Sequence, residues 1–340
     1  MKRLSLLVLG ALPLVCSLAC DKLPFGGKKS GPAGASSESA AADPAEAADE
    51  KLGQKLEEYL TGCLNNSART DFRISADHYE ETVAKKGPSE KEVPYLHKVD
   101  LKNVAECEQA VAKAKAMPPA LPELEGAAAA YLATIKAGAP TLNEAQAYYD
   151  QKDYKDDKMA KGLSLHPQLV DLFKKFNTTS KAMSEAFSKQ KGPLDARDLA
   201  RLKTKGPEAA YLTKRSVMDA DDFSKLLNVT SVKEFFAVPV ADLQAKVDLL
   251  TKDLADLQKL VDANGPELKG TSGVKRYASE LTDFVKEAKE VTRRIRDKTQ
   301  FTDSELERLG TGSGWMTDGS PDKLDRQRVS LIRSYNSIQL

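Results

Sequence analysis

The sequence has almost no histidine and no excess of either charge. Only three of its 340 residues are histidine, which leaves little material for histidine-based metal sites. Lysine and arginine together number 51, and aspartate and glutamate together number 50. This balance gives no electrostatic footprint for nucleic acid or for anionic lipid, so we expect no nucleic-acid partner.

Motifs of catalysis and cofactor binding are also missing. The chain contains no Gly-x-Ser-x-Gly, no His-Glu-x-x-His and no Cys-x-x-Cys. A glycine-rich run at 310–315 resembles a phosphate-binding loop, but it lacks the Gly-Lys-Ser/Thr ending and a preceding strand. We therefore predict no catalytic residue, no metal and no cofactor, which favours a protein that is not an enzyme. Trp315 and Met316 either pack onto the helices or form an exposed anchor for a partner.

The first 19 residues have the features of an export signal. A cationic start precedes an apolar stretch at 6–18, which is shorter than the roughly 20 residues of a membrane-spanning helix. Ala19 places a small residue directly before Cys20, as in bacterial lipoprotein signals, although Ser17 departs from the usual aliphatic residue. We predict that Cys20 is lipidated and becomes the new N-terminus. The alternative is an ordinary secretory signal with Cys20 as an incidental thiol.

Residues 20–49 are predicted to be a flexible linker. They are rich in Pro, Gly, Ser and Ala and have too few large apolar side chains to form a core. A flexible chain of this length spans roughly 30 Å. The sequence thus predicts a lipoprotein of the bacterial cell envelope that faces the periplasm. Its lipid would attach it to the membrane, inner or outer undecided, and an envelope protein or a cell-wall component would be its partner.

From residue 50 onward the sequence predicts a single domain made only of helices. Leu, Ala, Lys and Glu dominate, and strand-like alternation is absent. We expect an elongated antiparallel helical bundle, with joints at Gly192-Pro193, Gly206-Pro207 and Ser320-Pro321. A loop at 219–230 is where the domain could divide into two lobes. The expected helices cover residues 50–85, 101–117, 123–149, 167–190, 194–218, 231–262, 266–300 and 321–339.

Two of these helices carry continuous apolar stripes. Apolar residues recur every three or four positions from Val240 to Val261 and from Val274 to Ile295. A stretch of turn-forming residues, Asn264-Gly265-Pro266, lies between them. This pattern favours an antiparallel helical hairpin, and it also permits a coiled-coil dimer.

Two cysteines remain beyond Cys20. Cys63 shares a helix face with leucines at 56 and 60, and Cys107 shares one with valines at 104 and 111. Both thiols would point into a common core if the two helices pack, and an exported compartment permits disulfides. We predict a Cys63–Cys107 disulfide, and two separate buried thiols are the alternative.

The densest polar stretch is the candidate binding site. Carboxylates, tyrosines and one histidine between 148 and 166 could bind a solute or a cation. Four lysines balance the four aspartates, and the spacing fails the calcium-loop pattern. The alternative is a structural crossover between helices, with packed tyrosines and exposed charges. The candidate residues are Tyr148, Tyr149, Asp150, Asp153, Tyr154, Asp156, Asp157 and His166.

The run Tyr148 to Lys158, followed by Gly162 and His166-Pro167, resembles the YiiG-like family of bacterial lipoproteins. Tyr59-x-x-x-Cys63-x-Asn65 and Ser334-Tyr335-Asn336 are also similar to it, so the resemblance covers about 50–340. It implies an all-helical, exported, lipid-anchored protein whose domain has no known function. The resemblance supplies no catalytic residue.

We therefore expect a lipid-anchored binding, interaction or structural module that is not an enzyme. One alternative is a solute- or metal-binding protein that uses the 148–166 segment. Another is a hydrolase of an envelope polymer, which would need paired carboxylates across a cleft.

Overall fold

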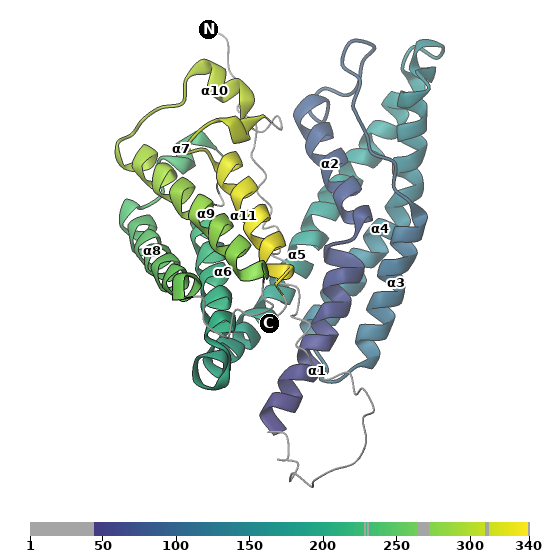
Figure 1. The fold of residues 1–340 in the computed structure, drawn as a ribbon. Helices are drawn as coiled ribbons and strands as arrows, with labels where there is room; N and C mark the ends of the chain where they lie inside the picture. The colour runs from purple at the N-terminus through teal and green to yellow at the C-terminus, as the bar shows by residue number, and fades with distance from the viewer. Residues whose placement is uncertain (1–43, 228, 230, 264–271, 310–312, 339–340) are drawn as a thin grey trace. The chain divides into compact units, whose positions relative to one another are not determined.

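Helices make up the regular structure (Figure 1). The computed structural model describes residues 44–227, 229, 231–263, 272–309 and 313–338, and every regular element in these ranges is a helix. The predicted all-α fold is confirmed. Within the same ranges, each helix is too short or too polar to span a lipid bilayer. The predicted signal, Cys20 and most of the linker lie outside the described residues, and the first helix begins at Pro44, inside the predicted linker.

The described residues form two compact units, one ending at Leu194 and the other beginning at Asp195. This division lies inside α5 (Ala160–Lys205), whereas the sequence suggested a boundary near 219–230. The predicted joint at Gly192-Pro193 is part of the same helix. Phe187 and Leu194, on either side of it, are both buried, so continuing the helix keeps its apolar face in contact with the core.

The N-terminal unit has a core of aromatic and aliphatic side chains. Phe72 and Phe176 stack with ring centres 5.2 Å apart, and Tyr131 lies 6.2 Å from Phe176. These three rings join α2, α4 and α5. The elements of this unit are α1 (Pro44–Tyr59), a π-helical turn (Leu60–Leu64), α2 (Ser67–Thr82), α3 (Leu101–Ala116), α4 (Pro122–Asp150) and the first part of α5.

The π-helical turn divides what the sequence predicted as one helix at 50–85. Asn66 begins α2, because its side chain accepts a hydrogen bond from the Ala68 amide. The turn also presents Cys63 to α3. Cys63 and Cys107 are fully buried and joined by a disulfide, with their Cα atoms 4.7 Å apart. The predicted pairing is confirmed.

A fully buried lysine closes the connection between α3 and α4. Lys55 donates hydrogen bonds to the carbonyl oxygens of Met117 and Pro119, and its Nζ lies 2.5 Å from Glu125. A buried ammonium group is costly unless it is paired, and here an opposite charge and two carbonyls surround it.

The C-terminal unit is organised around α9. α9 packs against α8 and α11, and α6 packs against α8. The apolar stripe on α9 is buried along its whole length, from Val274 to Ile295. The elements are α6 (Glu208–Leu226), α7 (Val232–Phe235), α8 (Val240–Ala263), α9 (Ser272–Arg296), α10 (Asp303–Arg308) and α11 (Pro321–Asn336).

Chain length fixes the relative direction of α8 and α9. The 24 residues of α8 extend for about 36 Å, whereas the connection at 264–271 reaches at most about 30 Å. A parallel arrangement of two packed helices would need a longer connection. The predicted antiparallel hairpin is therefore confirmed, and the predicted turn itself lies outside the described residues.

The expected loop at 219–230 is instead helical as far as Leu226. Asp221 and Asp222 pair with Lys225 and with cations on other helices, which satisfies their charges inside a helix. Phe223 is fully buried and packs edge-on against Phe284 of α9. Tertiary packing thus outweighs the low helix propensity of aspartate.

Removing the disulfide should destabilise the N-terminal unit. In the chain-entropy model, a bridge closing a loop of about 45 residues contributes roughly 4 kcal/mol. We expect a Cys63→Ala, Cys107→Ala double variant to lower the free energy of unfolding by up to this amount in urea titrations followed by circular dichroism. Reduced wild-type protein should match the variant. Equal urea midpoints for oxidised wild type and the double variant would contradict the assignment.

Candidate functional site

The tyrosines of the 148–166 segment face the interior. Tyr148, Tyr149 and Tyr154 are all buried, and the rings of Tyr149 and Tyr154 meet the Tyr148 ring edge-on at 5.1 and 6.5 Å. Burial and a hydrogen bond to Asp157 raise the pKa of Tyr148 to about 12. The Tyr148 phenol is therefore a neutral packing group near pH 7.

Asp157 has a structural role at the start of α5. Its side chain accepts hydrogen bonds from the Lys161 amide over 2.9 Å and from the Tyr148 hydroxyl over 2.7 Å. The Lys161 amide is the main cause that holds the pKa of Asp157 below its usual range. A carboxylate that accepts a backbone amide at a helix N-terminus is a helix cap.

The other candidate ligands of this segment do not converge. Asp150, Asp153 and Asp156 are exposed, and the His166 Nδ1 lies 2.8 Å from the Tyr79 hydroxyl. In the part of the chain that the structure describes, no group of three or more His, Cys, Asp or Glu residues is arranged to hold a metal ion. The contacts thus have the form of the crossover that the sequence analysis gave as the alternative.

Gly162 makes the packing of this crossover possible. A Cβ at this position would lie 2.5 Å from the Met159 Sδ, 3.0 Å from the Tyr149 hydroxyl and 3.2 Å from Tyr148. A Cβ this close to the Met159 Sδ would force that side chain to move and would crowd both tyrosines, so glycine favours the observed packing.

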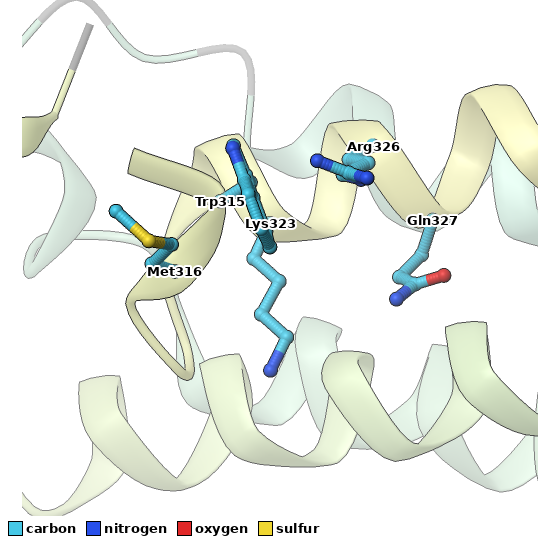
Figure 2. Close-up of a pocket in the computed structure, with 5 residues that line it drawn as sticks. All are labelled: Trp315, Met316, Lys323, Arg326 and Gln327. Atoms are coloured by element: carbon cyan, nitrogen blue, oxygen red, sulfur yellow. The ribbon is translucent and has the colours of Figure 1, made fainter. Parts of the chain in front are cut away.

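An open pocket lies in the C-terminal unit where the turn before α11 meets that helix. Its volume is about 500 Å³, and Trp315 and Met316 line it with side chains that are 41% and 51% exposed. Figure 2 shows Lys323 and Gln327 extending from α11 to the same side, with Arg326 between them along the helix. We call these five residues the Trp315 pocket.

A buried glutamate of α9 fixes the turn that carries Trp315. Glu287 is 3% exposed and accepts a hydrogen bond from the Gly319 amide over 2.6 Å, and Lys323 Nζ lies 3.4 Å from its other oxygen. Burial raises the pKa of Glu287, and both partners oppose this shift. Gly319 has a φ of 67°, and a Cβ there would lie 3.1 Å from the Glu290 carbonyl oxygen. The turn therefore depends on glycine as well as on Glu287.

The two cations of the pocket differ in their partners. Lys323 pairs with Asp318 as well as with Glu287. The Arg326 guanidinium lies 4.0 Å from the centre of the Trp315 ring, and no described residue gives it a hydrogen-bond acceptor or an opposite charge. The described lining residues combine apolar and cationic side chains with one amide. This arrangement suits the binding of a ligand.

A second charged cluster lies between α6 and α8 and is partly buried. Arg215 Nε lies 2.6 Å from Asp253, and its Nη2 lies 2.8 Å from Asp256. Asp253 is 3% exposed, and the Asp219 carboxyl lies close enough to influence its pKa. Burial chiefly, together with Asp219, raises the pKa of Asp253 to about 7, although Arg215 opposes the shift. The Asp253 carboxyl therefore keeps its proton well above the pH at which an aspartate normally ionises.

Sequence reasoning identified one half of the Trp315 pocket and missed the other. The sequence predicts Trp315 and Met316 to be either a packed pair or an exposed anchor, and both are exposed. It does not indicate Arg326 and Gln327, because they lie on the next helix and the turn at 314–320 brings them close to Trp315. Neither Asp219 nor Asp253 is marked by any local motif.

Replacing Gly162 with alanine should destabilise the crossover. Because the added Cβ overlaps Met159 and Tyr149, we expect Gly162→Ala to lower the free energy of unfolding by about 1–3 kcal/mol. Gly126 of α4 is the matched control, since nothing lies within 4 Å of a Cβ built there. Gly126→Ala should raise stability by up to about 1 kcal/mol in the same urea titrations. Equal effects of the two substitutions would contradict the packing described for Gly162.

The buried Asp253 carboxyl should make stability depend on pH. The pKa of Asp253 lies above that of an unfolded aspartate, near 4, so the folded state keeps a proton that the unfolded state releases. This contribution to the free energy of unfolding should therefore fall as the pH rises from about 4 to about 7.

The substitution Asp253→Asn tests this dependence. As the pH rises through this range, wild type should lose the contribution of Asp253, whereas the variant has no such contribution to lose. The stability of the variant relative to wild type should therefore increase with pH. Asp256→Asn is the control: Arg215 lowers the pKa of Asp256, so the contribution of Asp256 to stability is lost only below about pH 4 and should not change across this range. Stability curves of Asp253→Asn and wild type that run parallel with pH would show that Asp253 titrates normally.

Comparison with known proteins gives a family but no activity. The sequence matches the family described as "Protein of unknown function (DUF3829)" over residues 50–337. It is 29% identical over 262 residues to the "Uncharacterized protein YiiG" of Escherichia coli (strain K12), which covers 75% of this chain and 70% of that protein. No solved structure matches the chain. The match over most of the sequence confirms the resemblance seen in its motifs, and the chain belongs to this family of proteins of unknown function.

Proposed function

We propose that this protein is a lipid-anchored component of the bacterial cell envelope whose helical body binds a partner and catalyses no reaction. The anchor is inferred from the sequence, where an export signal ends at Cys20 and a polar linker follows. The buried Cys63–Cys107 disulfide supports this location, because such bonds persist in oxidising compartments such as the periplasm.

The exposed Trp315 pocket is the observation that carries the binding function. A tryptophan that is 41% exposed would normally be covered in a folded domain, and here a turn held by Glu287 presents it beside Met316. Rigid aromatic side chains of this kind are enriched at the centres of protein interfaces. The binding surface in this proposal is therefore the Trp315 pocket and not the 148–166 segment, whose tyrosines are used in packing.

Metabolic labelling with palmitate tests the anchor. In a bacterial host, the full-length wild-type chain should incorporate the label and sediment with membranes. Cys20→Ala should lose both properties, because it removes the acceptor thiol. Cys16→Ala should keep both properties. Equal labelling of wild type and Cys20→Ala would refute lipidation at Cys20.

Photo-crosslinking in intact cells tests the binding surface. A photoreactive amino acid in place of Met316 should give a discrete adduct, identifiable by mass spectrometry, and Trp315→Ala should abolish it. The same group at Leu249 of α8, which is 44% exposed, is the control and should give no such adduct. Identical adduct patterns at the two positions, or no adduct at Met316, would argue against a partner at this pocket.

A further inference from the structure

Arg326 differs from the other cations around it. The Cζ atom of its guanidinium lies 4.0 Å from the centre of the Trp315 ring, so one face of the guanidinium is covered by the indole. The N–H donors lie along the edge of the guanidinium and stay available to a ligand. Among the described residues, none accepts a hydrogen bond from Arg326 or pairs with its charge. Arg328 on the same helix pairs with Asp325 and Asp221. The Trp315 pocket thus contains one cation that is held in place and has no counter-ion among the described residues.

The shape of a guanidinium specifies the missing counter-ion. Its paired N–H groups match the two oxygens of a carboxylate or a phosphate. The charge around the pocket favours the singly charged carboxylate. Lys323 is already shared by Glu287 and Asp318, so it cannot balance the second negative charge of a phosphate. Asp318 is exposed and would repel a dianion.

The apolar part of the pocket specifies what accompanies the carboxylate. Trp315 and Met316 present exposed apolar surface directly beside Arg326, within a pocket of about 500 Å³. An aromatic or aliphatic side chain can lie on this surface while its neighbouring carboxylate reaches the guanidinium. Gln327 adds an amide that can bond to a peptide group.

We propose that the Trp315 pocket binds a peptide carboxylate that lies next to an apolar side chain, with Arg326 as its counter-ion and Trp315 and Met316 as its apolar contacts. This inference rests on the proposed binding function and adds the chemical class of the ligand. Arg326 sets the preference for a carboxylate, and Trp315 both orients Arg326 and forms the surface for the side chain.

The chain has a single tryptophan, so the indole N–H resonance of Trp315 reports on this pocket alone. The probe is N-acetylphenylalanine, titrated into the ¹⁵N-labelled protein. We expect a saturable shift with a dissociation constant on the order of 1 mM, as for a fragment of this size. N-acetylphenylalaninamide, which lacks the charge, should bind about tenfold more weakly. Phenyl phosphate should also bind more weakly than the carboxylate.

Substitutions separate the charge from the rest of the pocket. Arg326→Gln should bind N-acetylphenylalanine only as tightly as it binds N-acetylphenylalaninamide. Its affinity for N-acetylphenylalaninamide should be almost the same as that of wild type. Arg326→Lys should recover only part of the loss, because a lysine cannot form the paired contact. Arg276→Gln, the same change at an exposed arginine of α9, is the matched control and should bind like wild type.

Each other outcome overturns the inference in a distinct way. Equal affinity for acid and amide would mean that the pocket recognises only apolar surface. Tighter binding of phenyl phosphate would assign it to phosphorylated ligands. No shift with any probe would exclude a carboxylate ligand of this type. In all three cases the crosslinking at Met316 decides separately whether the pocket has a partner, so failure of the ligand class is distinguishable from failure of the proposed function.

Discussion

A single buried carboxylate, that of Glu287, determines the position of the turn that carries Trp315. Glu287 projects from the buried side of α9, and it bonds to the Gly319 amide and pairs with Lys323 of α11. Because α9 is fixed by its apolar stripe, these contacts fix the turn and the start of α11. The stack of Trp315 and Arg326 follows from that geometry. An exposed tryptophan held in this way loses little conformational freedom when a ligand covers it.

Periodicity in the sequence was sufficient to predict the all-helical fold and the α8–α9 hairpin. The stripes beginning at Val240 and Val274 are long and regular, and a short connection between them leaves only one way to pack. The pairing of Cys63 with Cys107 was predictable for the same reason, since both lie on apolar helix faces. Patterns that repeat over several turns are reliable because many side chains contribute to the same conclusion.

Local signals failed where distant residues supply the stabilising contacts. Gly192-Pro193 has the composition of a joint, yet buried neighbours keep α5 continuous. Residues 219–226 look like a loop, but cations on other helices neutralise their aspartates. The candidate site at 148–166 could not be resolved from sequence, because its residues suit both a ligand site and a crossover. The sequence indicated Trp315 but not Arg326. Arg326 lies beside Trp315 because of the turn that Glu287 holds.

The proposed binding function depends on the position of Arg326 beside Trp315. The most direct test of this account is a crystal structure of the protein with N-acetylphenylalanine bound. The account predicts both carboxylate oxygens within about 3 Å of the Arg326 guanidinium and the phenyl ring on Trp315. A ligand bound at another surface, or in this pocket with its carboxylate turned away from Arg326, would contradict it.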